Sequence, residues 1–139
     1  LAIAEEQARA KGQTFQASVP LESSITTDPL LLGRILRELL HNAVKYTPPQ
    51  GSIRLQIETE NRQSHIQVSN SQEIPSEELT RIFERFYRIP KSDPWKEGGT
   101  GLGLALVKQM VDQLRGSIEV SSAAGWTTFT LHLPPLPQF

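Results

Sequence analysis

Two stretches of alternating apolar and polar residues lie in the middle of this chain. Residues 52–60 and 64–70 both repeat every second residue, and Asn61 lies between them. The pattern predicts an antiparallel hairpin, because a strand with one face on a core places every second side chain there. Further strands are expected over residues 14–19, 23–27, 117–122 and 126–133. Helical segments alternate with these mostly antiparallel strands. This favours an α+β fold in which helices cover one face of a sheet in a two-layer sandwich.

The expected helices carry recognisable start and stop signals. Residues 1–10 favour a helix that ends before Gly12. Asp28 followed by Pro29 predicts a helix that runs to Tyr46, because Asp caps free N–H groups and Pro fits the first turn. Further helices are expected over residues 77–86, with Ser76 as the cap, and over residues 102–115.

Length and composition narrow the function classes. The chain has 139 residues and is expected to form a single domain over residues 1–139, with a frayed tail at 134–139. A formal charge of −1 without a basic stripe argues against nucleic-acid binding, and the lack of cysteine excludes thiolate metal sites and cysteine nucleophiles. No apolar run approaches the roughly 18 residues of a membrane span. We therefore expect a cytoplasmic domain without membrane contact, and the lack of an initiating Met suggests that it is part of a longer protein.

A glycine-rich stretch precedes the last helix. Residues 98–104 read GGTGLGL, and the amphipathic segment ALVKQMVDQLRG follows at once. One interpretation is a tight loop into a packed helix. The other is that the glycines bring the backbone close to an anion at the helix N-terminus, where free N–H groups and the helix dipole favour negative charge. This stretch alone leaves both interpretations open.

The helix expected over residues 29–46 carries a narrow polar stripe. At about 100° per residue, Glu38, Asn42 and Lys45 fall in line. An ordinary solvated face would explain this stripe. A functional site would also explain it, because amide and carboxylate oxygens suit Mg²⁺ and an ammonium group suits phosphate. Arg34 and His41 lie beside the stripe. The opposite face is expected to be buried and comprises Leu32, Leu36, Leu39, Leu40 and Ala43.

Three motifs in order resemble those of one protein family. Residues 38–48, ELLHNAVKYTP, resemble the N box of sensor histidine kinases. RIFERFYR at 81–88 resembles their F box, and GGTGLGLALVKQMV at 98–111 resembles their second glycine box. The chain is thus similar to the catalytic, ATP-binding domain of these kinases, within the superfamily of gyrase, mismatch-repair ATPases and heat-shock chaperones. The resemblance implies a Bergerat-type sandwich, with three helices on a mixed, mostly antiparallel sheet and ATP under a mobile lid.

The resemblance also implies residue roles. Asn42 would coordinate Mg²⁺, with Glu38 beside it at the position where hydrolysing relatives have their general base. Lys45 would approach the phosphates and Tyr46 the adenine, so that Glu38, Asn42 and Lys45 are the implied catalytic residues. The implied nucleotide-binding residues are Asn42, Lys45, Tyr46, Asn70, Arg88, Gly99, Thr100, Gly101, Leu102, Gly103, Leu104 and Thr127, with further charge from Lys91 or Lys96.

The first glycine box departs from the family pattern. The family has roughly D-x-G-x-G there, and its Asp accepts a hydrogen bond from the adenine amine. The matching residues 68–75 read VSNSQEIP, with Asn70 in place of the Asp, no glycine and one residue fewer. Asn70 can still accept this bond, without charge assistance. Trp126 also stands where a glycine is usual. The expected consequence is a weakened or reshaped nucleotide site between Asn70 and Ile74.

The phosphoacceptor of the family reaction is expected to lie elsewhere. His41, His65 and His132 lack its sequence context and are expected to be solvent-facing or packed. The resemblance therefore implies transfer of the γ-phosphate of Mg-ATP to a histidine on a separate dimerising helical hairpin. The full protein would be a homodimer that passes its phosphoryl group to a response regulator.

Other function classes remain open at the level of sequence. The chain could be a stand-alone serine kinase of the anti-sigma-factor type, although its F box argues against this. It could be a hydrolysing ATPase in which Glu38 activates water. It could also be a pseudokinase or an interaction module without nucleotide, which the altered first glycine box makes credible. Rossmann and P-loop sites are excluded, because neither glycine motif is present.

Overall fold

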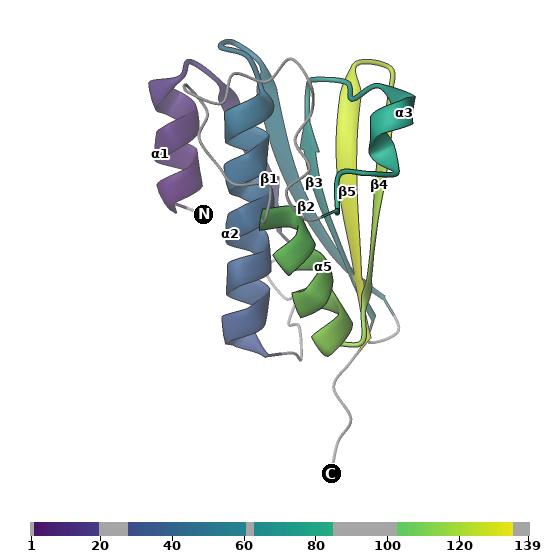
Figure 1. Ribbon diagram of the computed structural model, residues 1–139. Coiled ribbons are helices and arrows are strands. Elements are labelled where there is room, and N and C mark those ends of the chain that lie inside the picture. The colour runs from purple at the N-terminus through teal and green to yellow at the C-terminus, as the bar shows by residue number, and fades with distance from the viewer. Residues whose placement is uncertain (1, 20–27, 61–62, 85–102, 135–139) are drawn as a thin grey trace.

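A single mixed sheet forms one layer of the molecule. The computed structural model describes residues 2–19, 28–60, 63–84 and 103–134. The strands are β1 (Thr14–Ser18), β2 (Ser52–Glu60), β3 (Gln63–Asn70), β4 (Ser117–Ala123) and β5 (Trp126–Leu133). Their order in the sheet is β1-β2-β3-β5-β4 (Figure 1). The β1–β2 pair is parallel and the other three pairs are antiparallel. The α+β prediction and the predicted hairpin are therefore confirmed.

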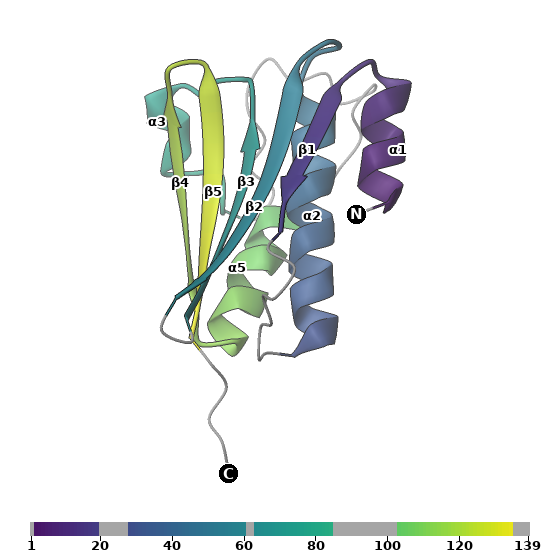
Figure 2. The ribbon, with the colours of Figure 1, turned by 180° about the vertical axis from the view of Figure 1, so that it is seen from behind.

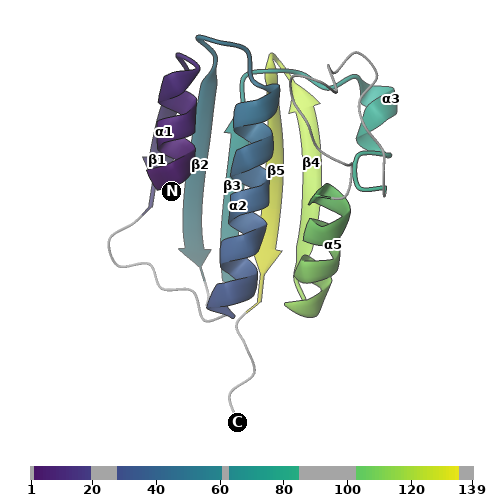
Figure 3. The same cartoon turned by 60° about the vertical axis from the view of Figure 1, so that its left-hand side comes forward.

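Three helices form the second layer. These are α1 (Ala2–Ala10), α2 (Pro29–Tyr46) and α5 (Gly103–Gln113). All three cover the same face of the sheet, with α2 over its middle strands and α5 over the β4 side (Figures 1 and 3). The view from behind shows that no described helix covers the opposite face (Figure 2). The structure thus has the expected two-layer sandwich, and a fourth, short helix, α3 (Ser76–Leu79), lies beside β4.

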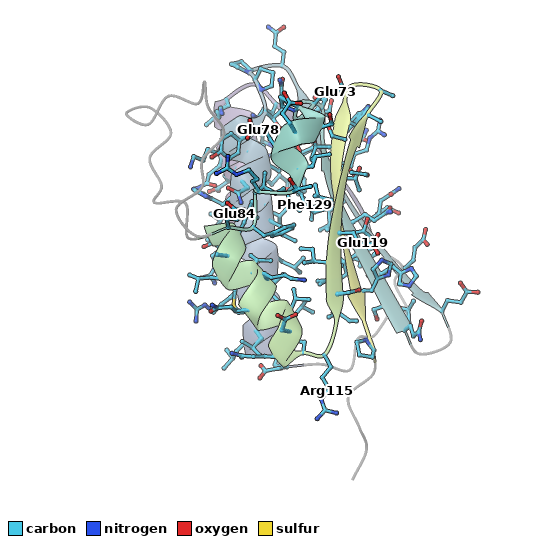
Figure 4. The ribbon with its side chains drawn as sticks, turned by 45° about the vertical axis from the view of Figure 1, so that its right-hand side comes forward. Glu73, Glu78, Glu84, Arg115, Glu119 and Phe129 are labelled. Carbon is cyan, nitrogen blue, oxygen red and sulfur yellow. The ribbon has the colours of Figure 1, made fainter. Side chains whose placement is uncertain are left out.

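Alternating burial along the strands separates the two faces of the sheet. One face packs against the helices, and the other, here called the bare face, is covered by no described helix (Figure 2). In β5 every odd-numbered residue is buried and every even-numbered residue is partly exposed. Phe129 lies on the helix side of the sheet, whereas Glu119 of the neighbouring strand lies on the other side (Figure 4). The largest fully buried core side chains come from α2, three of the strands and α5: Ile35, Leu39, Ile53, Leu55, Ile66, Val68, Val107, Val111 and Leu131.

The predicted boundaries of α2 are confirmed, but its buried face differs in part from the expectation. Asp28 accepts hydrogen bonds from the N–H groups of Leu30 and Leu31, as an N-cap does. Leu39, Leu40 and Ala43 are buried as expected, whereas Leu32 and Leu36 are only partly buried. Ile35 and Val44 are buried in addition, and they lie at the two opposite edges of the expected face, so the buried surface of α2 is wider than expected.

The helix predicted over residues 77–86 is shorter than expected. Its helical part is α3, with Pro75 at the N-cap position and Ser76 as its first residue, so the prediction of a Ser76 cap is wrong. After α3 the backbone continues in turns joined by Arg81 N–H to Glu78 C=O and Glu84 N–H to Arg81 C=O bonds. These i→i+3 contacts replace α-helical ones while Ile82 is buried and the Phe83 ring packs edge-on against Phe129, with centroids 6.1 Å apart.

Some predicted segments lie outside the described residues. They are the strand at 23–27, residues 85–88 of the F box, the expected lid at residues 87–98 and the tail beyond Pro134. Within the residues that the structure describes, no helix is both long and apolar enough to cross a membrane.

Candidate nucleotide-binding site

The polar stripe of α2 lies at the surface of the helix. Glu38, Asn42, Lys45 and Tyr46 are each partly exposed. The Lys45 ammonium lies 5.0 Å from the centre of the Tyr46 ring, within the range of a cation–π contact. Asn42 is only partly buried and does not belong to the buried set of α2, which comprises Ile35, Leu39, Leu40, Ala43 and Val44. A functional role at position 42 can therefore be tested with little change to the core.

The last turn of α2 is fixed by two residues that follow α1. The Lys11 ammonium donates to the carbonyl oxygens of Val44 at 2.8 Å and of Lys45 and Thr47 at 3.3 Å. The buried Gln13 amide donates to Val44 and Thr47 at 3.0 and 2.6 Å. A cation at a helix C-terminus also interacts favourably with the helix dipole. This contact holds the turn that carries two of the predicted nucleotide-binding residues.

The polar stripe meets the first turn of α5 at Glu38 and Gly103. A Cβ built on Gly103 would lie 2.7 Å from Glu38 Oε2, which is closer than side chains approach. The glycine that starts α5 thus leaves the space in which the Glu38 carboxylate lies. The second glycine box and the N box are therefore parts of one surface, because Glu38 and Gly103 lie side by side there.

Asn70 ends β3 on the side of the sheet that faces the helices. It follows Ile66 and Val68 in the buried alternation of this strand and is 7% exposed. Its neighbours across the sheet are Ile53 and Thr127. Among the residues that the structure describes, none forms a hydrogen bond with the Asn70 carboxamide, and the amide is not sealed from solvent. Buried amides are usually paired, so the Asn70 carboxamide is available to form hydrogen bonds with a ligand.

A chain of hydroxyl groups fixes the loop that follows Asn70. The buried Thr127 hydroxyl donates its one proton to the Gln72 carbonyl at 2.5 Å. Its contact with Ser122 Oγ at 3.0 Å must then be donated by Ser122, which in turn accepts from the Ile74 N–H at 2.8 Å. The direction of every bond in this chain follows from the single proton of Thr127.

The other end of the same loop is fixed against β2. Ser71 accepts a bond from the Ser52 N–H through its hydroxyl at 2.7 Å, and its own N–H donates to the Ser52 carbonyl at 2.9 Å. The Gln72 N–H donates to the Asn70 carbonyl. The first glycine box, which lacks glycines here, is thus an ordered turn that is hydrogen-bonded on both sides. It lies at the same end of the molecule as the last turn of α2 (Figure 1).

Comparisons with known proteins identify the family of this chain. The family described as histidine kinase-, DNA gyrase B-, and HSP90-like ATPase matches residues 27–137. The chain belongs to this ATPase family.

The relatives in this family include sensor kinases. The sensor histidine kinase CusS of Escherichia coli O157:H7 is 40% identical over 114 residues, which cover 81% of this chain and 24% of CusS. The mycobacterial sensor histidine kinase MprB shares 30% identity at a TM-score of 0.80, covering 96% of this chain and 91% of the solved one. Histidine kinase ThkA in complex with response regulator protein TrrA has the same fold, with 23% identity and a TM-score of 0.80 over 98% of this chain and 38% of that one. The chain spans about a quarter of the length of the curated kinase CusS.

Within this ATPase domain, the structure brings together some of the predicted residues. Glu38 contacts Gly103, Asn70 lies opposite Thr127, and Lys45 lies over Tyr46. Leu104 is partly buried and packs on the core. Five predicted nucleotide-binding residues lie outside the described ranges: Arg88, Gly99, Thr100, Gly101 and Leu102. The proposed lid cations Lys91 and Lys96 also lie outside them.

Trp126 does not lie on the side of the sheet that carries the candidate site. It belongs to the partly exposed, even-numbered residues of β5, and its ring stacks under the Arg54 guanidinium at 4.2 Å. Both side chains thus lie on the bare face of the sheet. The Trp126 side chain therefore points away from the candidate site that it was expected to reshape.

The histidines of the domain are placed away from this site or on its exposed rim. His41 is exposed on α2, and His65 packs edge-on against His132 on the bare face, with ring centroids 4.6 Å apart. A shallow hollow of about 250 Å³ lined by His65, His132 and Arg115, among others, lies at the end of the sheet where β4 begins. Glu73 marks the opposite end of the molecule, where the candidate site lies, in Figure 4. In the described ranges no cluster of three or more His, Asp or Glu residues could hold a metal ion by itself.

Sequence reasoning missed the residues that support the site. Lys11 and Gln13 act on carbonyls 31–36 positions away, which no local pattern indicates. Ser122 could have been found, because the two-residue turn Ala124-Gly125 with positive φ angles of 55° and 84° sets a hairpin register that pairs Ser122 with Thr127.

Proposed function

We propose that this domain binds Mg-ATP between α2, the first turn of α5 and the ends of β3 and β5. The contact of Glu38 with Gly103 carries this proposal, because it joins the polar stripe to the start of α5. The first turn of a helix offers unpaired N–H groups to an anion such as phosphate. At the other side, the buried Asn70 carboxamide offers hydrogen bonds to a base.

The donor set fits a magnesium nucleotide. Mg²⁺ prefers oxygen ligands and is commonly held by one or two side chains together with phosphates and water, rather than by a complete protein cage. The amide oxygen of Asn42 and the carboxylate of Glu38 supply such oxygens one helical turn apart. When bound, Mg²⁺ would neutralise phosphate charge. Lys45 would supply a further positive charge at the phosphates, and Tyr46 would lie against the base.

The residues of this chain would then position a phosphoryl group rather than react with it. Phosphoryl transfer requires in-line geometry and charge stabilisation more than covalent chemistry from the enzyme. Glu38, Asn42 and Lys45 would fix the metal and phosphate end of the nucleotide. Asn70 and Thr127 would fix its base end, because the hydroxyl chain from Ser122 holds the loop between them.

The acceptor of the γ-phosphate is proposed to be a histidine on a separate helical dimerisation domain. Relatives named sensor histidine kinases support this, and their chains are about four times as long as the part matched here. The ThkA–TrrA complex supports a response regulator as the next partner of a homodimeric full-length protein. We place the domain in the cytoplasm, where ATP is available.

Substitution of Asn42 tests this function. Asn42→Ala is expected to abolish Mg-dependent binding of ADP, measured by calorimetry, while circular dichroism and the unfolding midpoint stay unchanged. His41→Ala, at the exposed neighbouring position, is the matched control and is expected to bind like the parent. An Asn42→Ala variant that binds Mg-ADP as the parent does would contradict the assignment of the site.

A further inference from the structure

We propose that the base site of this domain accepts 6-oxopurine nucleotides, such as those of hypoxanthine, as well as adenine nucleotides. The inference rests on the proposed function and adds its substrate class. It follows from the amide at position 70, from its burial and from the finding that no described residue fixes its orientation.

A carboxamide differs from a carboxylate in the bases that it can read. An ionised Asp offers acceptors alone, whereas Asn offers an acceptor oxygen and two N–H donors. Adenine presents an amine at position 6 and an acceptor at N1. A 6-oxopurine presents the reverse pair, a carbonyl oxygen and an N–H. Rotation of the amide by 180° exchanges its donor and acceptor, so that one Asn can satisfy either edge.

The surroundings of Asn70 leave this rotation free. The residue is 93% buried, and its carboxamide has no hydrogen-bond partner in the part of the chain that the structure describes. The hydroxyl of Thr127, its partner in the register of β3 and β5, is already committed to the Gln72 carbonyl and the Ser122 hydroxyl. Within the described ranges, no protein group thus holds the amide in the orientation that adenine requires.

The expected selectivity follows from the cost of unmet polar groups. A site that is built to pair with one polar edge rejects an analogue strongly, by about 10⁴-fold or more, when buried groups are left unpaired. Because the Asn70 carboxamide can rotate by 180°, its donor and its acceptor can both be paired with either purine. We therefore expect the dissociation constants for the two base classes to differ by less than about tenfold.

Titration of the domain with Mg-ADP and with Mg-IDP tests this directly. IDP carries the 6-oxo edge without the 2-amino group of guanine, so that no added bulk complicates the comparison. Dissociation constants within tenfold of each other support the proposal. A preference for ADP above tenfold overturns it while leaving the ATP site intact. A folded domain that binds neither nucleotide overturns the proposed function and this inference with it.

Two variants test whether residue 70 causes the tolerance. Asn70→Asp is expected to tighten ADP and weaken IDP, so that their ratio rises at least thirtyfold, because a carboxylate accepts from the adenine amine and faces a carbonyl in IDP. Gln67→Glu makes the same change of amide to carboxylate on the same strand, at a partly exposed position on the other face, and should leave the ratio unchanged. An Asn70→Asp ratio equal to that of the parent would show that residue 70 does not read the base and would overturn the proposal.

Discussion

The Glu38 carboxylate lies in the space that a side chain at Gly103 would occupy, with 2.7 Å between Oε2 and the position of a Cβ there. Gly103 has no positive φ angle, so the backbone itself would accept alanine. Gly103→Ala is therefore expected to gain little stability in the parent, because the gain from a less flexible unfolded chain is offset by displacement of Glu38. In a Glu38→Ala background the same change should stabilise the domain by about 0.4–1 kcal/mol. Urea denaturation of the four proteins measures this difference.

Gly33 supplies the control for this comparison. It lies exposed within α2, and a Cβ there would meet nothing within 4 Å. Gly33→Ala should thus raise the free energy of unfolding by about 0.5–1 kcal/mol whether residue 38 is Glu or Ala. Equal gains from Gly103→Ala in both backgrounds would contradict the contact between Glu38 and Gly103.

Removal of the Ser122 hydroxyl should release the loop after Asn70. Ser122→Ala leaves the Ile74 N–H without its acceptor and the Thr127 oxygen without its donor. We expect a loss of about 1–3 kcal/mol in the free energy of unfolding, together with faster hydrogen exchange at the Ile74 amide. Ser121→Ala, one residue earlier and exposed, should change neither quantity. Unchanged exchange at Ile74 in the Ser122 variant would exclude the hydroxyl chain.

The Lys11 ammonium should stabilise the C-terminal end of α2. Lys11→Met keeps most of the apolar stem and removes the charge that contacts three carbonyl oxygens. We expect a loss of about 1–2 kcal/mol, seen as a lower midpoint of thermal unfolding. Lys108→Met removes an exposed cation from α5 and serves as the control. If both variants unfold at the same temperature as the parent, Lys11 does not anchor the helix.

Much of the fold could be predicted because its signals are local. The Asp28-Pro29 pair indicates where α2 begins, and alternation over 52–60 and 64–70 indicates the β2–β3 hairpin. The length of α3 could not be predicted in this way. Its sequence permits a longer helix, but the backbone forms turns instead, because Ile82 and Phe83 pack against the core there. Tertiary contacts thus override local propensity there.

The candidate site divides in the same manner. Asn42 and Lys45 stand out in the sequence, because they share a face of one helix. The ordered structure of the loop after Asn70 could not be predicted from local sequence. It depends on Ser122 and Thr127, which lie more than 45 positions away along the chain. The lack of glycines in this box predicts a weakened or reshaped site, whereas the structure shows a loop that is held by hydrogen bonds to Ser52, Ser122 and Thr127.

Calorimetric titration of this domain with Mg-ATP tests the central claim most directly. The account predicts saturable binding with a dissociation constant between about 10 µM and 1 mM, equivalent to roughly 4–7 kcal/mol, and no saturable binding once Asn42 is replaced by alanine. The absence of any heat of binding at millimolar Mg-ATP, from a domain whose circular dichroism shows it folded, would contradict the account and favour an interaction module without nucleotide.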